Sequence, residues 1–247
     1  MTNAAKTVQC KVEPIYMIAG SKGGVGKSIV SLVVIDLLLE AGKQLLFIET
    51  DTSNPDVWRC LERDPEAAPG EPIEGVVMHT ARLEEPDGWI DIVNLADMHK
   101  DRVVVVNTAA RTNDAVKKYG AILRDTVSEL GRRLVTLWLI NRQRDSMDQL
   151  REHLAVFPDA VVHVVRNGYF GEEAKFELYN NSKLRTSIEQ KGGRSLTLPD
   201  LADRVADALY TESYAVSEAL RHMPLGNRAE LLRWRNQSKQ VFGPVLA

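Results

Sequence analysis

One short segment, residues 22–28, constrains the fold of this chain more than any other. It reads Lys-Gly-Gly-Val-Gly-Lys-Ser and lies between an apolar run at residues 15–19 and an apolar, helix-length segment at residues 27–41. Glycines allow successive backbone N–H groups to converge on one anion, and a helix that begins there adds its positive end. The lysine and serine at the start of that helix can supply a charge for phosphate and a hydroxyl for Mg²⁺. The segment therefore predicts a strand, loop and helix that hold the phosphates of a nucleotide.

The rest of the chain repeats the alternation of strand and helix. Further apolar, β-branched runs occur at residues 44–48, 102–106, 134–140 and 160–165, with residues 195–198 as a candidate sixth. Helical patterns lie at residues 114–130, 145–156, 200–210, 212–222 and 227–242. Consecutive apolar residues are typical of strands buried on both faces of a parallel sheet. We therefore predict an α/β fold with a doubly wound, mostly parallel sheet and helices on both faces.

The predicted organisation is one domain over residues 1–247, in which residues 211–247 form a C-terminal helical extension. Residues 62–88 contain four prolines and several acids and are predicted to be a mobile excursion from this domain. The chain has two cysteines without metal-ligand spacing, a formal net charge of −3 and no apolar stretch long enough to span a bilayer. These features predict a cytoplasmic protein, and a polyanionic partner would have to be met by a local basic patch.

The glycine segment departs from the usual GxxxxGK[ST] pattern because Ser21 stands where that pattern has its first glycine. The variant KGGxGK[ST] resembles the ParA/MinD family of deviant-Walker P-loop ATPases. This resemblance implies ATP and Mg²⁺ as ligands and an ATP-dependent homodimer in which Lys22 reaches the phosphates held by the partner subunit. It also implies nucleotide contacts from the loop and the first helical turn, by Gly23, Gly24, Val25, Gly26, Lys27, Ser28 and Ile29.

Carboxylates follow the second apolar run, where Glu49-Thr-Asp51 resembles the family's DxD segment with glutamate in place of the first aspartate. The resemblance implies that Asp51 positions the attacking water, with Lys22 and Lys27 as the other catalytic residues. The third run ends in Asn107, where family members carry an aspartate. The expected Mg²⁺ ligands, direct or through water, are Ser28, Asp51, Glu49 and Asn107. A neutral Asn107 is compatible with slow natural turnover, with compensation by Glu49 or Asp51, or with an engineered change.

Two features bear on the base of the nucleotide. Asn167 follows the fifth apolar run, where the family's asparagine hydrogen-bonds adenine, and Pro199 resembles the proline of a loop that packs against the base. A plain strand-end turn would also select Asn167 followed by glycine. Guanine-reading relatives carry an aspartate where this chain has Arg144, so ATP is favoured over GTP.

The last two predicted helices are basic, although the whole chain is not. Residues 221–239 hold a single acid, Glu230, against Arg221, Arg228, Arg233, Arg235 and Lys239. In ParA relatives such residues bind DNA without sequence preference. In MinD an amphipathic tail contacts the membrane. A third interpretation is a terminal helix docked on the sheet with its charges in water.

The function implied by the resemblance is an ATP-dependent dimerisation switch with slow hydrolysis, acting in plasmid or chromosome partition or in conjugative transfer with an adaptor protein. Residues 176–182 resemble TraL/StbB-like plasmid transfer and stability ATPases. The alternative is a nucleotide-gated scaffold that barely hydrolyses ATP and positions a protein or membrane complex, an interpretation that Asn107 favours.

Overall fold

A seven-stranded, fully parallel sheet organises the molecule. The computed structural model describes residues 13–62, 72–110 and 112–246. The strand order is β3-β2-β4-β1-β5-β6-β7. The strands are β1 (Ile15–Gly20), β2 (Leu45–Glu49), β3 (Val76–Thr80), β4 (Val103–Asn107), β5 (Leu134–Ile140), β6 (Val161–Asn167) and β7 (Ser195–Leu198). The predicted parallel sheet is confirmed.

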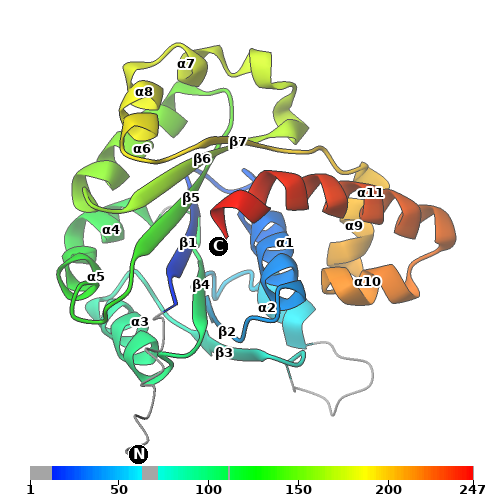
Figure 1. The fold of residues 1–247 in the computed structure, drawn as a ribbon, viewed down its shortest axis with the longest axis horizontal. Coiled ribbons are helices and arrows are strands. Elements are labelled where there is room, and N and C mark those ends of the chain that lie inside the picture. The colour runs from blue at the N-terminus through cyan, green and yellow to red at the C-terminus, as the bar shows by residue number, and fades with distance from the viewer. Residues whose placement is uncertain (1–12, 63–71, 111, 247) are drawn as a thin grey trace, which may run out of the picture.

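Helices cover both faces of the sheet, as Figure 1 shows. One face carries α1 (Lys27–Glu40), α2 (Asp56–Glu62), α9 (Asp203–Thr211), α10 (Val216–His222) and α11 (Leu225–Phe242). The other carries α3 (Pro86–Met98), α4 (Asn113–Tyr119), α5 (Ala121–Thr126), α6 (Arg144–Val156), α7 (Glu177–Asn180) and α8 (Lys183–Gln190). Short 3₁₀ turns lie at η1 (Gly168–Phe170), η2 (Glu173–Lys175) and η3 (Gly243–Val245).

The two-sided burial explains the continuous apolar runs in the sequence. In β4, Val103 and Val105 belong to the core under α1, whereas Val104 and Val106 belong to the core under α3. Successive side chains of a strand point to opposite faces, so a strand covered on both faces has no polar position to alternate with. Apolar burial of this kind contributes about 25 cal/mol per Å² to folding.

The prediction that residues 62–88 form an excursion was wrong for the part that the structure describes. This part contains β3, and Pro86 begins α3; residues 63–71 lie outside the described residues. β3 is an edge strand in which only Val76 is fully buried, so its sequence lacks the continuous apolar pattern of the central strands. Proline is tolerated in the first turn of a helix, where its missing N–H has no intrahelical partner. The single helix predicted at residues 114–130 is divided into α4 and α5 at Gly120.

The C-terminal helices complete one helical layer. α11 packs against α1, β7 and α9, and α10 packs against α1 and α11. None of the helices in the described ranges combines the length and apolarity needed to cross a bilayer.

Candidate functional site

A cavity of about 700 Å³ opens at the carboxyl ends of the strands. This is the edge at which parallel α/β sheets bind ligands. Ten residues that the sequence predicted as site residues line it: Gly23, Gly24, Gly26, Lys27, Ser28, Ile29, Asp51, Asn107, Asn167 and Pro199. The structure thus brings the glycine loop, the carboxylate segment and the expected base-contacting residues to one place.

Two glycines give the loop its shape. Gly24 has φ +75° and Gly26 has φ +100°, values that non-glycine residues rarely adopt. A Cβ on Gly26 would also lie 2.5 Å from Asn167 Nδ2, well inside van der Waals contact. Glycine is required at position 26 for both reasons. Val25 differs from the other loop residues because its side chain is buried in the core, which leaves only its backbone for contact with a ligand.

Lys27 places a buried cation at the base of this loop. Its side chain is 7% exposed, and its ammonium donates a 2.9 Å hydrogen bond to the backbone oxygen of Lys22. Burial lowers the pKa of Lys27 to about 8, and the nearby charge of Asp51 partly offsets this effect. A phosphate group in the cavity would supply the countercharge that this ammonium needs.

Lys22 lies on the rim of a neighbouring cavity of about 620 Å³, which it shares with residues of α4 and α6. Its ammonium forms an ion pair with Asp145 and donates a 3.0 Å hydrogen bond to Gln143 Oε1. Asp145 stands in the first turn of α6, and Gln143 is the N-cap residue of that helix. Lys22 is therefore turned away from the cavity that contains Lys27.

Strand register brings Glu49 and Asn107 together, because they are paired positions of β2 and β4. Asn107 Nδ2 donates to Glu49 Oε1 at 2.9 Å, and Ser31 of α1 donates to Asn107 Oδ1 at 2.9 Å. The backbone N–H of Asp51 also donates to Glu49 Oε1. Glu49 is fully buried, and burial raises its pKa to about 7 despite these hydrogen bonds.

The oxygen-rich group at this place fits a magnesium ion. Glu49 Oε2 is buried and has no hydrogen-bond partner among the described residues. Ser28, Asp51 and Asn107 line the adjacent cavity. Mg²⁺ keeps several waters and takes one or two carboxylates in such sites, and a metal-bound water would satisfy the free oxygen of Glu49.

Asn167 braces the phosphate loop. Its Nδ2 donates to the backbone oxygen of Val25 at 2.9 Å, and its Oδ1 accepts from the N–H of Tyr169 at 3.0 Å. The second bond caps η1, which is the strand-end turn considered as the alternative for this residue. The amide nitrogen keeps a second proton and the oxygen a second lone pair, so a base contact remains chemically available.

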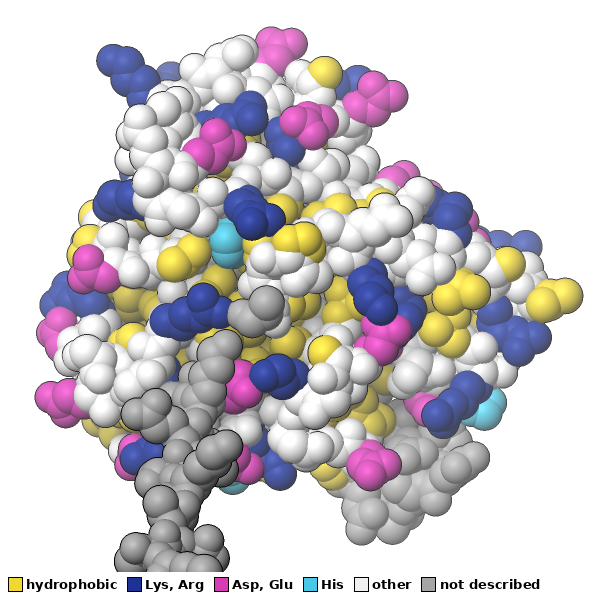
Figure 2. Space-filling view, viewed as in Figure 1, with side chains coloured by type: hydrophobic (Ala, Val, Ile, Leu, Met, Phe, Trp, Pro, Cys, Tyr) yellow, Lys and Arg dark blue, Asp and Glu magenta, His cyan; other side chains and the backbone are white. Residues whose placement is uncertain are grey.

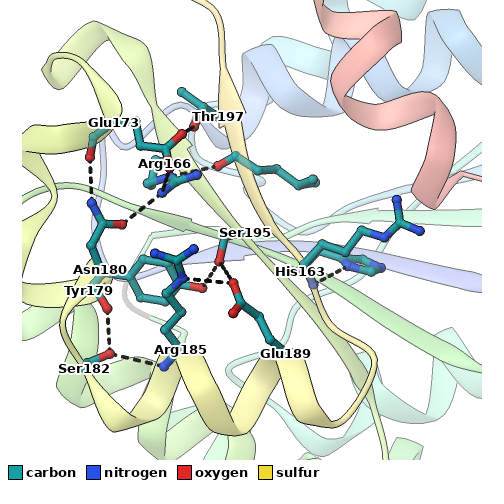
Figure 3. A network of polar contacts seen from close by, with 12 residues as sticks. His163, Arg166, Glu173, Tyr179, Asn180, Ser182, Arg185, Glu189, Ser195 and Thr197 are labelled. Atoms are coloured by element: carbon teal, nitrogen blue, oxygen red, sulfur yellow. Dashed lines mark hydrogen bonds and ion pairs between the residues drawn. The ribbon is translucent and has the colours of Figure 1, made fainter.

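A cluster of polar side chains around Arg166, the residue before Asn167, is shown in Figure 3. The guanidinium of Arg166, which is almost fully buried, donates to Glu173 at 2.7 Å and to Asn180 at 2.9 Å. Ser195 bonds both Tyr179 and Glu189 at 2.7 Å. These bonds attach residues 168–194 to β6 and β7 and hold the end of β6 in place.

Several cavity residues were not predicted. The polar and aromatic ones among them include Asn54, Asp56, Tyr169, Asp200, Asp203, Asp207, Tyr210 and Trp234. The aspartates at the start of α2 and α9 are also ordinary helix-start residues, so their sequence gives no signal for a site. Trp234 comes from a helix far along the chain, and only the fold brings it here.

The basic residues of the C-terminal helices are largely paired. Arg235 is bonded to Asp36 at 2.6 Å and to Glu40 at 3.2 Å, and Lys239 to Glu40 at 3.1 Å. Arg221 pairs with Glu218 and Arg233 with Glu230. Of the three interpretations of these helices, this pairing agrees with the terminal helix docked on the rest of the domain, because α1 supplies the acids that pair with Arg235 and Lys239. On the face seen in Figure 2, basic and acidic side chains are intermixed.

Comparisons with known proteins agree with this geometry. No family model matches the chain. It is 53% identical to Protein MobD of Acidithiobacillus ferrooxidans over 232 residues, which cover 94% of this chain and 97% of that protein. The solved MinD cell division protein of Aquifex aeolicus is 13% identical, with a TM-score of 0.53 over 92% of this chain and 97% of that one. The septum site-determining protein MinD of Pyrococcus horikoshii, complexed with Mg-ADP, is 12% identical, with a TM-score of 0.56 over 95% and 99%. The chain belongs to the MobD family and has the P-loop fold of the ParA/MinD-like ATPases.

Proposed function

We propose that this chain is a slow ATPase that binds ATP and Mg²⁺ in the 700 Å³ cavity and uses ATP to form a homodimer. The observation that carries the proposal is the buried ammonium of Lys27 inside a glycine loop, in a cavity that Ser28, Asp51 and Asn107 also line. Behind Asn107 lies Glu49, which has one buried carboxylate oxygen without a partner among the described residues. A cation and an oxygen ligand placed this way match the phosphate and magnesium ends of a nucleotide. The related fold of P. horikoshii MinD, complexed with Mg-ADP, supports the same assignment.

The residues around the cavity have separate tasks in this proposal. The loop from Gly23 to Gly26 offers backbone N–H groups to the phosphates, and Lys27 adds the charge that favours the γ-phosphate. Bound Mg²⁺ would neutralise charge on the phosphate oxygens, held by Ser28 and, through water, by Glu49 and Asn107. Asp51 orients the attacking water at the mouth of the cavity. Asn107 brings no charge, which keeps turnover slow.

The position of Lys22 supports the proposed dimerisation. Its side chain is about half exposed and lies outside its own nucleotide cavity. In the dimer it contacts the phosphates of the partner subunit. ATP shifts the monomer–dimer equilibrium only because it binds the dimer better, and the contact between Lys22 and the γ-phosphate supplies that difference.

The cellular role that we propose is plasmid or chromosome partition or conjugative transfer, with an adaptor protein as partner. The support is the resemblance of residues 176–182 to transfer and stability ATPases, and the A. aeolicus structure in which the related fold of MinD is in complex with MinC. Non-specific DNA is a further proposed partner. Its contacts would come from the more exposed basic side chains of α10 and α11, such as Arg221 (64% exposed) and Lys239 (56% exposed), rather than from Arg235 (13% exposed).

Asn107 favours a second candidate function, a scaffold that retains ATP and hydrolyses little of it. The two candidates differ in turnover. ATPase activity that rises with DNA supports the switch, whereas tight ATP retention without turnover supports the scaffold.

The proposal is tested by titrating a fluorescent ATP analogue in the presence of Mg²⁺ and by gel filtration with ATP or ADP. Lys27→Ala should abolish nucleotide binding. Lys43→Ala is the control, because Lys43 follows α1, pairs with Glu13 and does not line the cavity. Equal ATP binding by wild type and Lys27→Ala would remove the basis of the proposal.

A further inference from the structure

One turn of α11 contacts both the loop that follows β7 and the helix α1. Trp234 Nε1 donates a 2.8 Å hydrogen bond to the backbone oxygen of Pro199. The preceding residue, Arg233, donates to the backbone oxygen of Asp200 at 3.1 Å. The following residue, Arg235, is bonded to Asp36 of α1, the helix whose first turn holds Lys27. Three consecutive residues thus connect the loop at residues 199–202 with the helix that follows the phosphate loop.

The loop at residues 199–202, here called the base loop, is held by the buried side chain of Leu201 and by hydrogen bonds to its backbone. Besides the oxygens of Pro199 and Asp200, the N–H of Ala202 donates to Glu230 at 3.4 Å, and Glu230 is itself paired with Arg233 at 2.6 Å. Pro199 has no N–H to donate, which removes one backbone bond that could otherwise fix this loop. The side chains of α11 therefore supply the hydrogen bonds to the backbone on either side of Leu201.

Trp234 is also part of the cavity. It is fully buried, and it lines the cavity together with Pro199 and Tyr210. Its indole ring lies under the base loop and on the same side of the sheet as α1 and α9. Asn167 and Tyr169 line the cavity at the end of β6. The base of a nucleotide placed between Asn167 and the base loop would lie in a part of the cavity that is lined by Trp234 of α11.

We propose that Trp234 and Arg233 are positioning residues that fix the base loop and thereby set the selectivity of this chain for the base of its nucleotide. The inference rests on the proposed nucleotide binding. A loop already held in its bound conformation loses little entropy when a ligand arrives, so loss of these bonds weakens contact with the base. Because other residues form the phosphate loop, we expect loss of these bonds to leave the contacts with the phosphates unchanged.

Trp234→Phe tests this inference, because it removes the N–H donor and keeps most of the ring. Trp89→Phe is a matched control: Trp89 is fully buried, donates from Nε1 to the backbone oxygen of Leu83 at 3.0 Å, and lies on the opposite face of the sheet. Calorimetry would give the affinities of both variants and the wild type for ATP, GTP and inorganic tripolyphosphate. Tripolyphosphate reports on the phosphate loop alone.

We expect Trp234→Phe to bind ATP about tenfold more weakly, because the part-buried carbonyl of Pro199 loses its hydrogen-bond partner and the base loop is no longer fixed. Its tripolyphosphate affinity should equal that of the wild type, and its preference for ATP over GTP should narrow. Trp89→Phe should match the wild type for all three ligands. Arg233→Met should also weaken ATP binding. Because the Arg233 side chain is about half exposed, this variant tests the positioning role if Trp234→Phe does not fold.

Different outcomes separate the two proposals. If Trp234→Phe and Arg233→Met bind ATP and GTP with the affinities of the wild type, the positioning role is wrong while nucleotide binding stands. A parallel loss of ATP and tripolyphosphate in Trp234→Phe also contradicts it, since that pattern indicates general damage to the fold. A wild-type protein that binds neither ATP nor tripolyphosphate overturns the proposed function, and the positioning role with it.

Discussion

The ammonium group of Lys22 is paired with the carboxylate of Asp145 within the same chain. Gln143, two residues before Asp145, accepts a further hydrogen bond from it. The start of α6 thus holds the lysine that we assign to the partner's phosphates. Lys22 cannot contact Asp145 and a second subunit at the same time, so the internal pair favours the monomer.

Asp145→Asn should therefore strengthen ATP-dependent dimerisation. A half-exposed pair contributes about 0.5 kcal/mol, and two are lost per dimer, so we expect the association constant to rise about fivefold. Sedimentation equilibrium with ATP and Mg²⁺ measures it. Asp148→Asn is the matched control, since Asp148 lies on α6 and pairs with Arg151 instead. Weaker dimers from Asp145→Asn would show that the internal pair does not compete. Lys22→Ala should bind ATP and remain monomeric.

Asn107→Asp should make the protein depend on Mg²⁺ for its stability. The change replaces the amide that donates to Glu49 Oε1 with a second buried carboxyl group, so one of the two must be protonated in the absence of metal. We expect a loss of about 1–3 kcal/mol, which corresponds to a melting temperature lower by several degrees. Mg²⁺ with ADP should restore most of it, and ATP turnover should rise above that of the wild type.

Thermal melts with and without Mg-ADP measure this effect, and Asn236→Asp on the exposed side of α11 is the control. If Asn107→Asp and wild type have the same melting temperature without metal, the new carboxyl group at position 107 is not forced to share a buried site with Glu49.

The sequence could predict those parts of the site whose residues are contiguous in the chain or stand at the ends of apolar runs. The residues of the phosphate loop are contiguous, and a glycine loop between a buried strand and a helix has few other uses. Glu49 and Asn107 are 58 positions apart, yet both end apolar runs, and parallel strands bring such ends to one edge of the sheet. Their proximity therefore follows from the predicted topology.

The contacts of Lys22 with α6 and of Trp234 with the base loop could not be predicted in the same way. Each joins single residues far apart in the chain, and an aspartate at a helix start or a tryptophan in an amphipathic helix has ordinary structural uses. The three interpretations of the basic residues of α11 stayed open for a related reason. Their acidic partners Asp36 and Glu40 lie about 200 positions away, on a helix whose sequence gives no sign of which helix packs against it.

The affinity for ATP should fall as the pH rises above about 8. Burial lowers the pKa of Lys27 to about 8 in the nucleotide-free protein. Bound phosphate favours the charged lysine and raises that pKa, so binding takes up a proton between the two values. Below pH 8 the ammonium is already charged and affinity stays constant, whereas above it affinity falls by up to tenfold per pH unit. Calorimetry between pH 7 and 9.5 measures this slope, and a flat profile would contradict the burial of a charged Lys27.

Arg235→Ala should damage stability rather than DNA binding. Asp36 is buried, and burial raises its pKa while the guanidinium of Arg235 opposes that shift. Without Arg235 the carboxylate is left buried without its main partner, which costs about 3 kcal/mol at neutral pH. Because protonation removes that unpaired charge, the pKa of Asp36 rises further in the variant and the deficit should shrink as the pH falls toward 5. Urea unfolding at both pH values measures the deficit.

Arg221→Ala is the comparison for Arg235→Ala, because the Arg221 side chain is 64% exposed and its only described ion-pair partner is Glu218. It leaves the buried carboxylate of Glu218 in contact with His222, so it should cost less stability than Arg235→Ala. If α10 and α11 contact DNA, it should also lower both the affinity and the salt dependence of DNA binding. Each lost phosphate contact reduces the slope of log K against log salt by about one. Arg235→Ala should keep the wild-type slope, because its guanidinium is already occupied by Asp36 and Glu40. The reverse result, a stable Arg235→Ala with a reduced slope, would mean that α11 releases α1 to bind DNA.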